Sequence, residues 1–301
     1  MSETELRDEV LSQKAEIKRL RKSLSELTPP LTALLRRRGF RIYKKEKNDD
    51  LLLPEKKFID DYYTALNRYS FRLFLRDAIK HRELFTLKDV TRYATQGVTM
   101  DYIEYLLAIG LIVKEKRGVG GAVGDIPYRL KQEPVKSFGP TLEWFVAEIF
   151  RREFSTEAAW GVKFKRPVVG GDYDLLAKID GSILYGEVKS SPPKQIYGTE
   201  ISAFLDRTFD LKPEIALFFM DTELRMQDKI VPMFEEELRK RTAREITGFW
   251  GEGSPSDSPI QGERIEKELF HIEGKIFIIN AKESIPGNVE RVLRWFFRRS
   301  L

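Results

Sequence analysis

Two carboxylates and a lysine near the middle of the chain have the types and spacing for metal-assisted hydrolysis. Asp174 lies at the start of one apolar run, and Glu187 and Lys189 lie at the end of the next. Carboxylate oxygens are hard ligands that suit Mg²⁺ or Mn²⁺ better than Zn²⁺. A lysine beside them can orient or deprotonate a water and stabilise developing negative charge. The three residues can act together only if the fold brings the two runs side by side.

A tight hairpin would do so. Asp180-Gly181 lies between two runs of alternating apolar residues, which is the strongest short-range indication of a two-residue turn. In that register Asp174 lies directly opposite Glu187, and like charges held so close repel each other unless a cation lies between them. The alternative is an ordinary charge pair on an exposed sheet face. The apolar Tyr185 on the same face argues against that alternative.

Composition narrows the chemistry. The 301-residue chain contains no cysteine, which excludes disulfides, thiolate zinc sites and cysteine nucleophiles. His81 and His271 are the only histidines, and neither has a plausible partner, which argues against histidine catalysis and imidazole metal clusters. The sequence shows neither a signal peptide nor an apolar run long enough to span a membrane. We therefore expect a soluble, cytoplasmic protein with no membrane partner.

Three short motifs follow one another in a fixed order. Gly139 and Glu143 begin a predicted helix, Asp174 begins an apolar strand, and Glu-x-Lys at 187–189 ends the following strand. This order, with the intervening hairpin, resembles the PD-(D/E)XK nuclease superfamily, particularly its archaeal Holliday-junction-resolvase-like members. The resemblance covers about 60 residues. Tyr173 stands where the superfamily most often has proline, a position that it varies freely.

The resemblance implies a restriction-endonuclease-like fold and a catalytic set of Glu143, Asp174, Glu187 and Lys189. It implies that Asp174, Glu187 and the backbone carbonyl of Val188 bind Mg²⁺ or Mn²⁺. Glu143 would complete the metal shell through water or hold a second ion. The implied activity is hydrolysis of DNA by an endonuclease-like enzyme, with branched or damaged DNA in repair or recombination as a possible substrate class.

The first thirty residues carry a heptad pattern. Apolar residues recur at alternating spacings of four and three, with Gln13 as the only polar member, and Pro29-Pro30 ends the run. The repeat comprises Leu6, Val10, Gln13, Ile17, Leu20, Leu24 and Leu27. A helix with so narrow a stripe would either form a parallel coiled-coil homodimer or pack against its own domain, and the sequence leaves both open.

Residues 31–57 read as a basic connector, and residues 58–132 have the order of a winged helix-turn-helix domain. A long helix at 58–82 precedes a short helix that Thr86 caps, a helix at 99–110 that Thr99 caps, and a hairpin with a glycine-rich tip. This organisation resembles winged helix domains over about 75 residues.

Positive charge in this domain lies away from the helix that would read bases. The helix at 99–110 contains acidic residues and neither Lys nor Arg, which argues against sequence-specific reading of the major groove. Basic residues recur every four positions on the first helix and lie on the wing. They are Arg68, Arg72, Arg76, Lys80, Lys114, Lys116 and Arg117. They predict binding to the phosphate backbone, although a solvated basic face is the alternative.

Residues 138–301 are expected to form an α/β domain with a mixed central sheet flanked by helices. Two functions from different classes follow for the whole chain. The first is a Mg²⁺- or Mn²⁺-dependent nuclease that acts on DNA, with RNA not excluded, as a homodimer joined by the N-terminal helix. The second is a non-catalytic nucleic-acid-binding or regulatory protein that keeps the nuclease fold.

Overall fold

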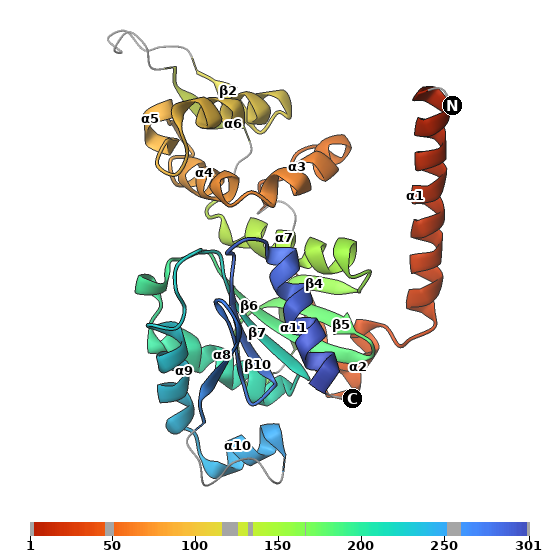
Figure 1. Cartoon of the computed structure of the whole chain (residues 1–301), viewed down its shortest axis with the longest axis vertical. Coiled ribbons are helices and arrows are strands. Elements are labelled where there is room, and N and C mark those ends of the chain that lie inside the picture. The colour runs from red at the N-terminus through yellow and green to blue at the C-terminus, as the bar shows by residue number, and fades with distance from the viewer. Residues whose placement is uncertain are drawn as a thin grey trace.

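The computed structural model describes residues 3–45, 51–115, 126–131, 135–165, 167–251 and 260–299. It contains an α/β lobe, a smaller helical lobe and a long N-terminal helix, α1 (Glu3–Glu26), that stands apart from both (Figure 1). On α1 the side chains of Val10, Ile17 and Leu20 are exposed. The described part of α1 therefore does not pack back on its own domain, and pairing with a second copy stays a prediction.

A mixed eight-stranded sheet organises the α/β lobe, as the sequence predicted. The strand order is β1-β4-β5-β6-β7-β10-β9-β8. In that order the strands are Ile42–Lys45, Ala158–Phe164, Tyr173–Ile179, Ser182–Lys189, Ile215–Met220, Ile276–Asn280, Leu269–Ile272 and Gly262–Glu266. Strands β6, β7 and β10 are parallel neighbours, and the remaining pairs are antiparallel. Because side chains alternate along a strand, neighbouring residues of each strand point to opposite faces of this sheet.

Helices cover both faces of this sheet (Figure 1). They are α2 (Leu31–Arg37), α7 (Gly139–Glu153), α8 (Gly198–Leu211), α9 (Ile230–Arg239), α10 (Ala243–Trp250) and α11 (Ile285–Arg299). Helices α7 and α11 share one core with Leu175 and Leu184, whereas α8 and α9 share a second core with Leu176 and Tyr185. These residues alternate along β5 and β6, so the two cores lie on opposite faces of the sheet.

The β5–β6 hairpin has the predicted register. Ile179 pairs with Ser182, and the pairing continues to Leu175 opposite Gly186. Asp180 and Gly181 have φ values of 46° and 88°, as a two-residue turn of this kind requires. The recorded pairs confirm the predicted turn and register from Leu175 to Ile179. That Asp174 lies directly opposite Glu187 stays a prediction.

Gly186 must lack a side chain because it packs directly on Leu175. A Cβ at position 186 would lie 2.9 Å from Leu175 Cδ2 and 3.1 Å from Leu175 Cβ. Overpacking of this kind costs about 1–3 kcal/mol, and we expect Gly186→Ala to lower the free energy of unfolding in urea by that amount. At Gly170 a Cβ meets nothing within 4 Å. The matched Gly170→Ala variant should change the free energy by less than about 0.5 kcal/mol, and equal losses would contradict the packing explanation.

The helical lobe consists of four α-helices and a hairpin. They are α3 (Ile59–Leu66), α4 (Tyr69–Lys80), α5 (Leu87–Val90), α6 (Gln96–Ala108), β2 (Ile112–Lys114) and β3 (Tyr128–Leu130), after a short 3-10 turn, η2 (Lys56–Phe58). Thr86 begins α5, as predicted, and forms a capping box with Asp89. Helices α4, α5 and α6 precede the antiparallel pair of β2 and β3, and a winged helix domain stays a prediction. The tip residues at 116–125 lie outside the described part of the chain.

Two boundaries in this lobe differ from the predictions. The predicted helix at 58–82 is two helices, because Asn67 donates its side-chain amide to the carbonyl of Tyr63 at 3.1 Å and Arg68 is extended. Helix α6 begins earlier than predicted, because Thr95 rather than Thr99 accepts the capping bond, from the N–H of Val98.

The predicted connector at 31–57 is also partly structured. Helix α2 buries Leu31 and Leu35, and β1 forms an edge strand that pairs antiparallel with β4. Residues 31–45 therefore belong to the α/β lobe, since their apolar residues complete the core beneath the edge of the sheet.

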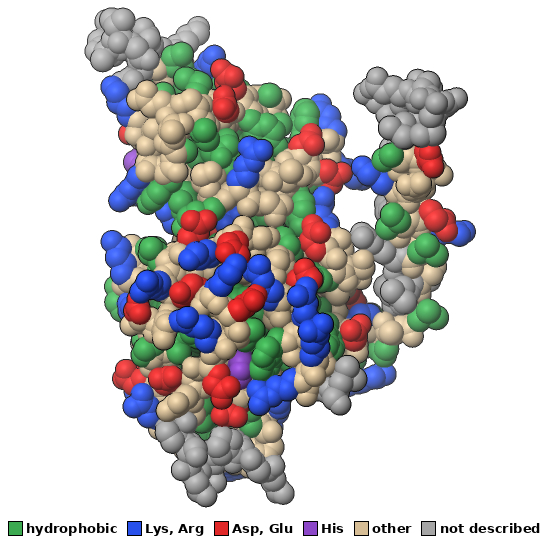
Figure 2. Space-filling view, viewed as in Figure 1, with side chains coloured by type: hydrophobic (Ala, Val, Ile, Leu, Met, Phe, Trp, Pro, Cys, Tyr) green, Lys and Arg blue, Asp and Glu red, His purple; other side chains and the backbone are tan. Residues whose placement is uncertain are grey.

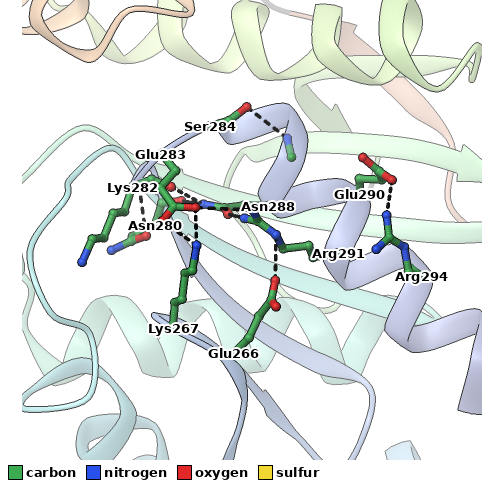
Figure 3. A network of polar contacts seen from close by, with 11 residues as sticks. Glu266, Lys267, Asn280, Lys282, Glu283, Ser284, Asn288, Glu290, Arg291 and Arg294 are labelled. Carbon is green, nitrogen blue, oxygen red and sulfur yellow. Dashed lines mark hydrogen bonds and ion pairs between the residues drawn. The ribbon is translucent and has the colours of Figure 1, made fainter.

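Two breaks shape the C-terminal end of the α/β lobe. Helices α9 and α10 are separate because Thr242 begins a new helix with a capping box to Glu245. Strands β8 and β9 form a hairpin in which Lys267 has a φ of 46°. Figure 3 shows how α11 is anchored to the end of β10: the side-chain amide of Asn288 donates to the carbonyl of Asn280 at 2.8 Å.

No helix in the described residues is long and apolar enough to cross a membrane.

The two lobes share one continuous core. Phe71 and Phe74 of α4 belong to the same buried cluster as Phe145 of α7 and Leu175 of β5. At the carboxyl end of β7, Arg72 Nε lies 2.9 Å from Asp221 Oδ1, with both side chains no more than 3% exposed. The lobes are therefore joined by apolar packing and by a buried ion pair.

Candidate active site

The candidate site lies on the face of the sheet that α8 covers. Asp174 on β5 and Glu187 and Lys189 on β6 point to this face. The Val188 N–H donates to Asp174 Oδ2 at 2.9 Å, and Lys189 Nζ donates to Glu187 Oε1 at 2.9 Å. The structure thus brings together Asp174, Glu187 and Lys189. Val188 contacts Asp174 through its N–H. A metal-binding role for the Val188 carbonyl stays a prediction.

Arg207 is a member of this site that the sequence analysis missed. From α8 its guanidinium donates to the Tyr185 hydroxyl at 2.8 Å and to Glu187 Oε2 at 2.7 Å. The Tyr185 hydroxyl donates to the same carboxylate oxygen at 2.6 Å. Both oxygens of Glu187 are therefore engaged. The available indication was an arginine among the apolar positions of an amphipathic helix, where an unpaired charge would not be tolerated.

Glu143 lies on α7, which packs against the face of the sheet that carries Leu175 and Leu184. Within the described residues, no three acidic or histidine side chains come close enough together to hold a metal ion. A catalytic or metal-binding role for Glu143 therefore stays a prediction, whereas the contacts of Glu187 with Lys189 and Arg207 are observed. The third acid near them is Glu200 of α8, which lies 3.6 Å from Lys189 Nζ.

The predicted nucleic-acid-binding residues differ in exposure. Arg72 is 1% exposed and ion-paired with Asp221, so it cannot contact a nucleic acid, because its charge is used inside the protein. Arg68, Lys80 and Lys114 are exposed. Arg76 is half-buried and donates to the carbonyl of Ser190 at 3.2 Å. Lys116 and Arg117 lie outside the described residues.

Burial and neighbouring charges give the two carboxyl groups opposite properties. Burial, followed by the charge of Glu187, raises the pKa of Asp174 to about 8. Burial would also raise the pKa of Glu187, but the charges of Lys189 and Arg207 outweigh it, and the pKa is lowered. Burial would lower the pKa of Lys189, yet Glu187 raises it overall. Near neutral pH, Asp174 is therefore protonated while Glu187 and Lys189 are charged.

The carboxylate oxygens of this site differ in how readily they could bind a hard divalent cation. Asp174 and Glu187 are carboxylates on neighbouring strands, and a cation would relieve the repulsion that raises the pKa of Asp174. Among the described residues, Asp174 accepts a single hydrogen bond, from Val188. Glu187, in contrast, already has two cationic partners, so its carboxylate would have to exchange one of them to bind a metal.

The pKa of Asp174 predicts how the metal-free protein responds to pH. The folded-state value of about 8 lies above the ordinary 3.8, so protonation of Asp174 favours folding below the lower value, and this contribution is lost as the pH rises through 8. In EDTA we expect the Tm of the wild type to fall by roughly 5 °C between pH 6 and pH 9 relative to Asp174→Asn. Differential scanning fluorimetry measures this. Asn keeps an acceptor for the Val188 N–H, and parallel pH profiles would show that Asp174 does not titrate there.

Comparisons with known proteins give distant likenesses. No family model and no curated protein matches the chain. Among solved structures, Can2 from Sulfobacillus thermosulfidooxidans in complex with cyclic tetra-adenylate is similar at 12% identity and a TM-score of 0.47, over 89% of this chain and 60% of Can2. Protein VC1899 from Vibrio cholerae is similar at 14% identity and a TM-score of 0.46, over 90% of this chain and 62% of that protein. The chain spans about three fifths of the length of each of these two proteins.

Proposed function

We propose that the protein is a Mg²⁺- or Mn²⁺-dependent nuclease of the PD-(D/E)XK type. The observation that carries the proposal is that Asp174 and Glu187, on neighbouring strands, are close enough to act on each other's charge, with Lys189 beside Glu187. A carboxyl group whose pKa is raised to about 8 by burial and a second carboxylate is destabilised unless a cation or a proton compensates it. Sites of this kind are characteristic of catalytic groups.

Asp174 and Glu187 would hold the divalent cation. When bound, the ion would neutralise charge on the phosphate oxygens and lower the pKa of the attacking water. Lys189 is charged, so it would donate to a phosphate oxygen and stabilise the negative charge that develops there, rather than accept a proton. Arg207 keeps Glu187 ionised and in position.

The reaction adds water across one P–O bond of the phosphodiester. The water oxygen bonds to phosphorus, the bond to the leaving sugar oxygen breaks, and that oxygen takes up a proton. The products are a phosphate monoester and a hydroxyl end. Donors that are already in place, such as Lys189, contribute because they need no reorganisation during this step.

A cleavage assay tests the proposal. The wild type would be incubated with Mg²⁺, Mn²⁺ or EDTA and with single-stranded, duplex, flapped and four-way-junction DNA, and with RNA of the same sequences. We expect cutting that requires the metal and that Asp174→Asn abolishes. Mn²⁺ titration by calorimetry accompanies it. Metal-dependent cutting that persists in Asp174→Asn would show that the assignment of the site is wrong.

The contacts of Glu187 favour a second candidate, a non-catalytic nucleic-acid-binding or regulatory protein. Lys189 and Arg207 already neutralise this carboxylate, which is 3% exposed. In that case neither Mn²⁺ binding nor cleavage would be detected, while nucleic-acid binding would remain. The same two assays therefore separate the candidates.

The helical lobe and α1 have roles in this proposal. We infer that the lobe is a winged helix domain that contacts the phosphate backbone, because α6 carries Asp101 and Glu104 and no cation with which to read bases. The exposed apolar side chains of α1 would pair with a second copy, and a dimer suits the cutting of two strands.

A further inference from the structure

A basic groove lies where the helical lobe meets the carboxyl end of β6. Its volume is about 400 Å³. Helix α4, the segment between α5 and α6, and the chain that follows β6 contribute side chains to it. The cationic ones are Arg76, Lys80, Arg92, Lys136 and Lys194. In α/β sheets, ligands bind beyond the carboxyl ends of parallel strands, and β6 and β7 are such a pair.

The groove has an excess of positive charge. Asp77 is the acidic residue among the described side chains that line it. Burial raises the pKa of Asp77, while the charges of Arg76, Arg92 and Lys80 oppose the rise. Within the described part of the chain, none of the five cations forms an ion pair with a carboxylate, so an anion would relieve their mutual repulsion.

An aromatic ring lies among these cations. The guanidinium groups of Arg76 and Arg92 lie 5.6 Å and 5.4 Å from the centre of the Tyr93 ring. The Tyr93 side chain is nevertheless 41% exposed. Cations that follow a backbone, combined with an aromatic platform for a base, are the features with which proteins bind single-stranded nucleic acids.

The groove is continuous with the candidate active site along the chain. Ser190 and Ser191, which line it, directly follow Lys189. The carbonyl of Ser190 accepts the hydrogen bond from Arg76, so α4 is fixed against the end of β6. Further along the same segment, Glu200 of α8 approaches Lys189. A strand that lies in the groove would therefore reach the end of β6, whose last residue is Lys189.

We propose that this groove binds a single-stranded segment of nucleic acid, with phosphates against the cations and one base stacked on Tyr93, and directs it to Lys189. The proposal rests on the proposed nuclease function for the fate of the bound strand. A single strand rather than a duplex follows from Tyr93, because a base can stack on its ring only when it is not held in a double helix.

Binding is measured without metal, so that it does not depend on cleavage. Fluorescence anisotropy in EDTA follows a labelled oligothymidylate of about 15 nucleotides. We expect the double variant Arg92→Ala/Lys136→Ala to bind at least about tenfold more weakly at low salt, and the slope of log K against log salt concentration to fall in magnitude by about 1.4. Tyr93→Ala should weaken binding by roughly 5- to 150-fold, whereas Tyr93→Phe should bind within about twofold of the wild type.

The matched control removes two arginines from another part of the surface. Arg294 and Arg298 lie on α11, along a second hollow that also contains Glu263 and Glu266. On the face shown in Figure 2, acidic and basic side chains are interspersed over this lobe. Arg294→Ala/Arg298→Ala should change the affinity by less than about twofold, because Arg294 is already paired with Glu290.

The outcomes are distinct. Three results would each contradict binding of a single strand in the groove. The first is unchanged binding by Arg92→Ala/Lys136→Ala, and the second is an equal loss of affinity in the control variant. The third is tighter binding of duplex that Tyr93→Ala does not affect. If the groove variants lose binding and the wild type cleaves no substrate, the proposed binding site is supported and the proposed nuclease activity is refuted. If the wild type cleaves and the groove variants bind normally, the nuclease activity is supported and the binding site is refuted.

Discussion

Replacing Lys189 with Met should slow cleavage by about 10²- to 10⁴-fold while nucleic-acid binding in EDTA stays within about threefold of the wild type. The ammonium group is a charged donor beside the two carboxyl groups, at 2.9 Å from Glu187 Oε1. Its loss removes stabilisation that matters most in the transition state, so the turnover rate should fall far more than the affinity. Single-turnover cleavage with Mn²⁺ measures the effect.

Lys163→Met is the matched control for this prediction. Lys163 Nζ lies 2.7 Å from Asp172 Oδ1 at the edge of β4 and β5, so the variant removes another lysine–carboxylate contact of the same sheet. It should cleave within about threefold of the wild type, as expected for a partly exposed ion pair. If the two variants cleave equally, Lys189 has no special part in the reaction.

Removing the carboxylate of Asp221 should destabilise the protein by about 3–5 kcal/mol. Arg72 would then remain buried without its partner, with the carbonyl of Leu66, at 2.6 Å from Nη1, as its other hydrogen-bond acceptor. Urea unfolding of Asp221→Ala, followed by tryptophan fluorescence, measures the loss.

The double variant Arg72→Met/Asp221→Leu tests the cause. It removes both charges and leaves apolar side chains in the contact between the lobes, so it should recover most of the lost stability. A double variant as unstable as Asp221→Ala would show that shape rather than charge determines this contact. A loss below about 1 kcal/mol in Asp221→Ala would show that the pair is solvated.

The contacts that the sequence predicted are local ones. The β5–β6 register depends on a two-residue turn and on alternation along two adjacent strands, and Asp180-Gly181 carries both kinds of information. The predicted closeness of Asp174 and Glu187 follows from the same register. The mixed sheet was predictable for the same reason, since buried strands such as β7 are continuous apolar runs.

The residues that the sequence mispredicted depend on distant partners. Arg72 belongs to a regular row of cations that suggests a solvated or ligand-binding face, but Asp221, 149 residues later, makes its burial possible. Arg207 reaches Glu187 across the packing of α8 on the sheet, and no local pattern specifies that contact. Glu143 was assigned from a motif, and its role stays a prediction, because the face of the sheet that its helix covers is decided by tertiary packing.

The shared core of the two lobes has a consequence for where a nucleic acid would be cut. Phe71, Phe74 and the Arg72–Asp221 pair tie α4 to the sheet. The offset between a base held on Tyr93 and a phosphate beside Lys189 would then be fixed when the chain folds. The protein would act as a ruler, and each cut would fall a constant number of nucleotides from the gripped base.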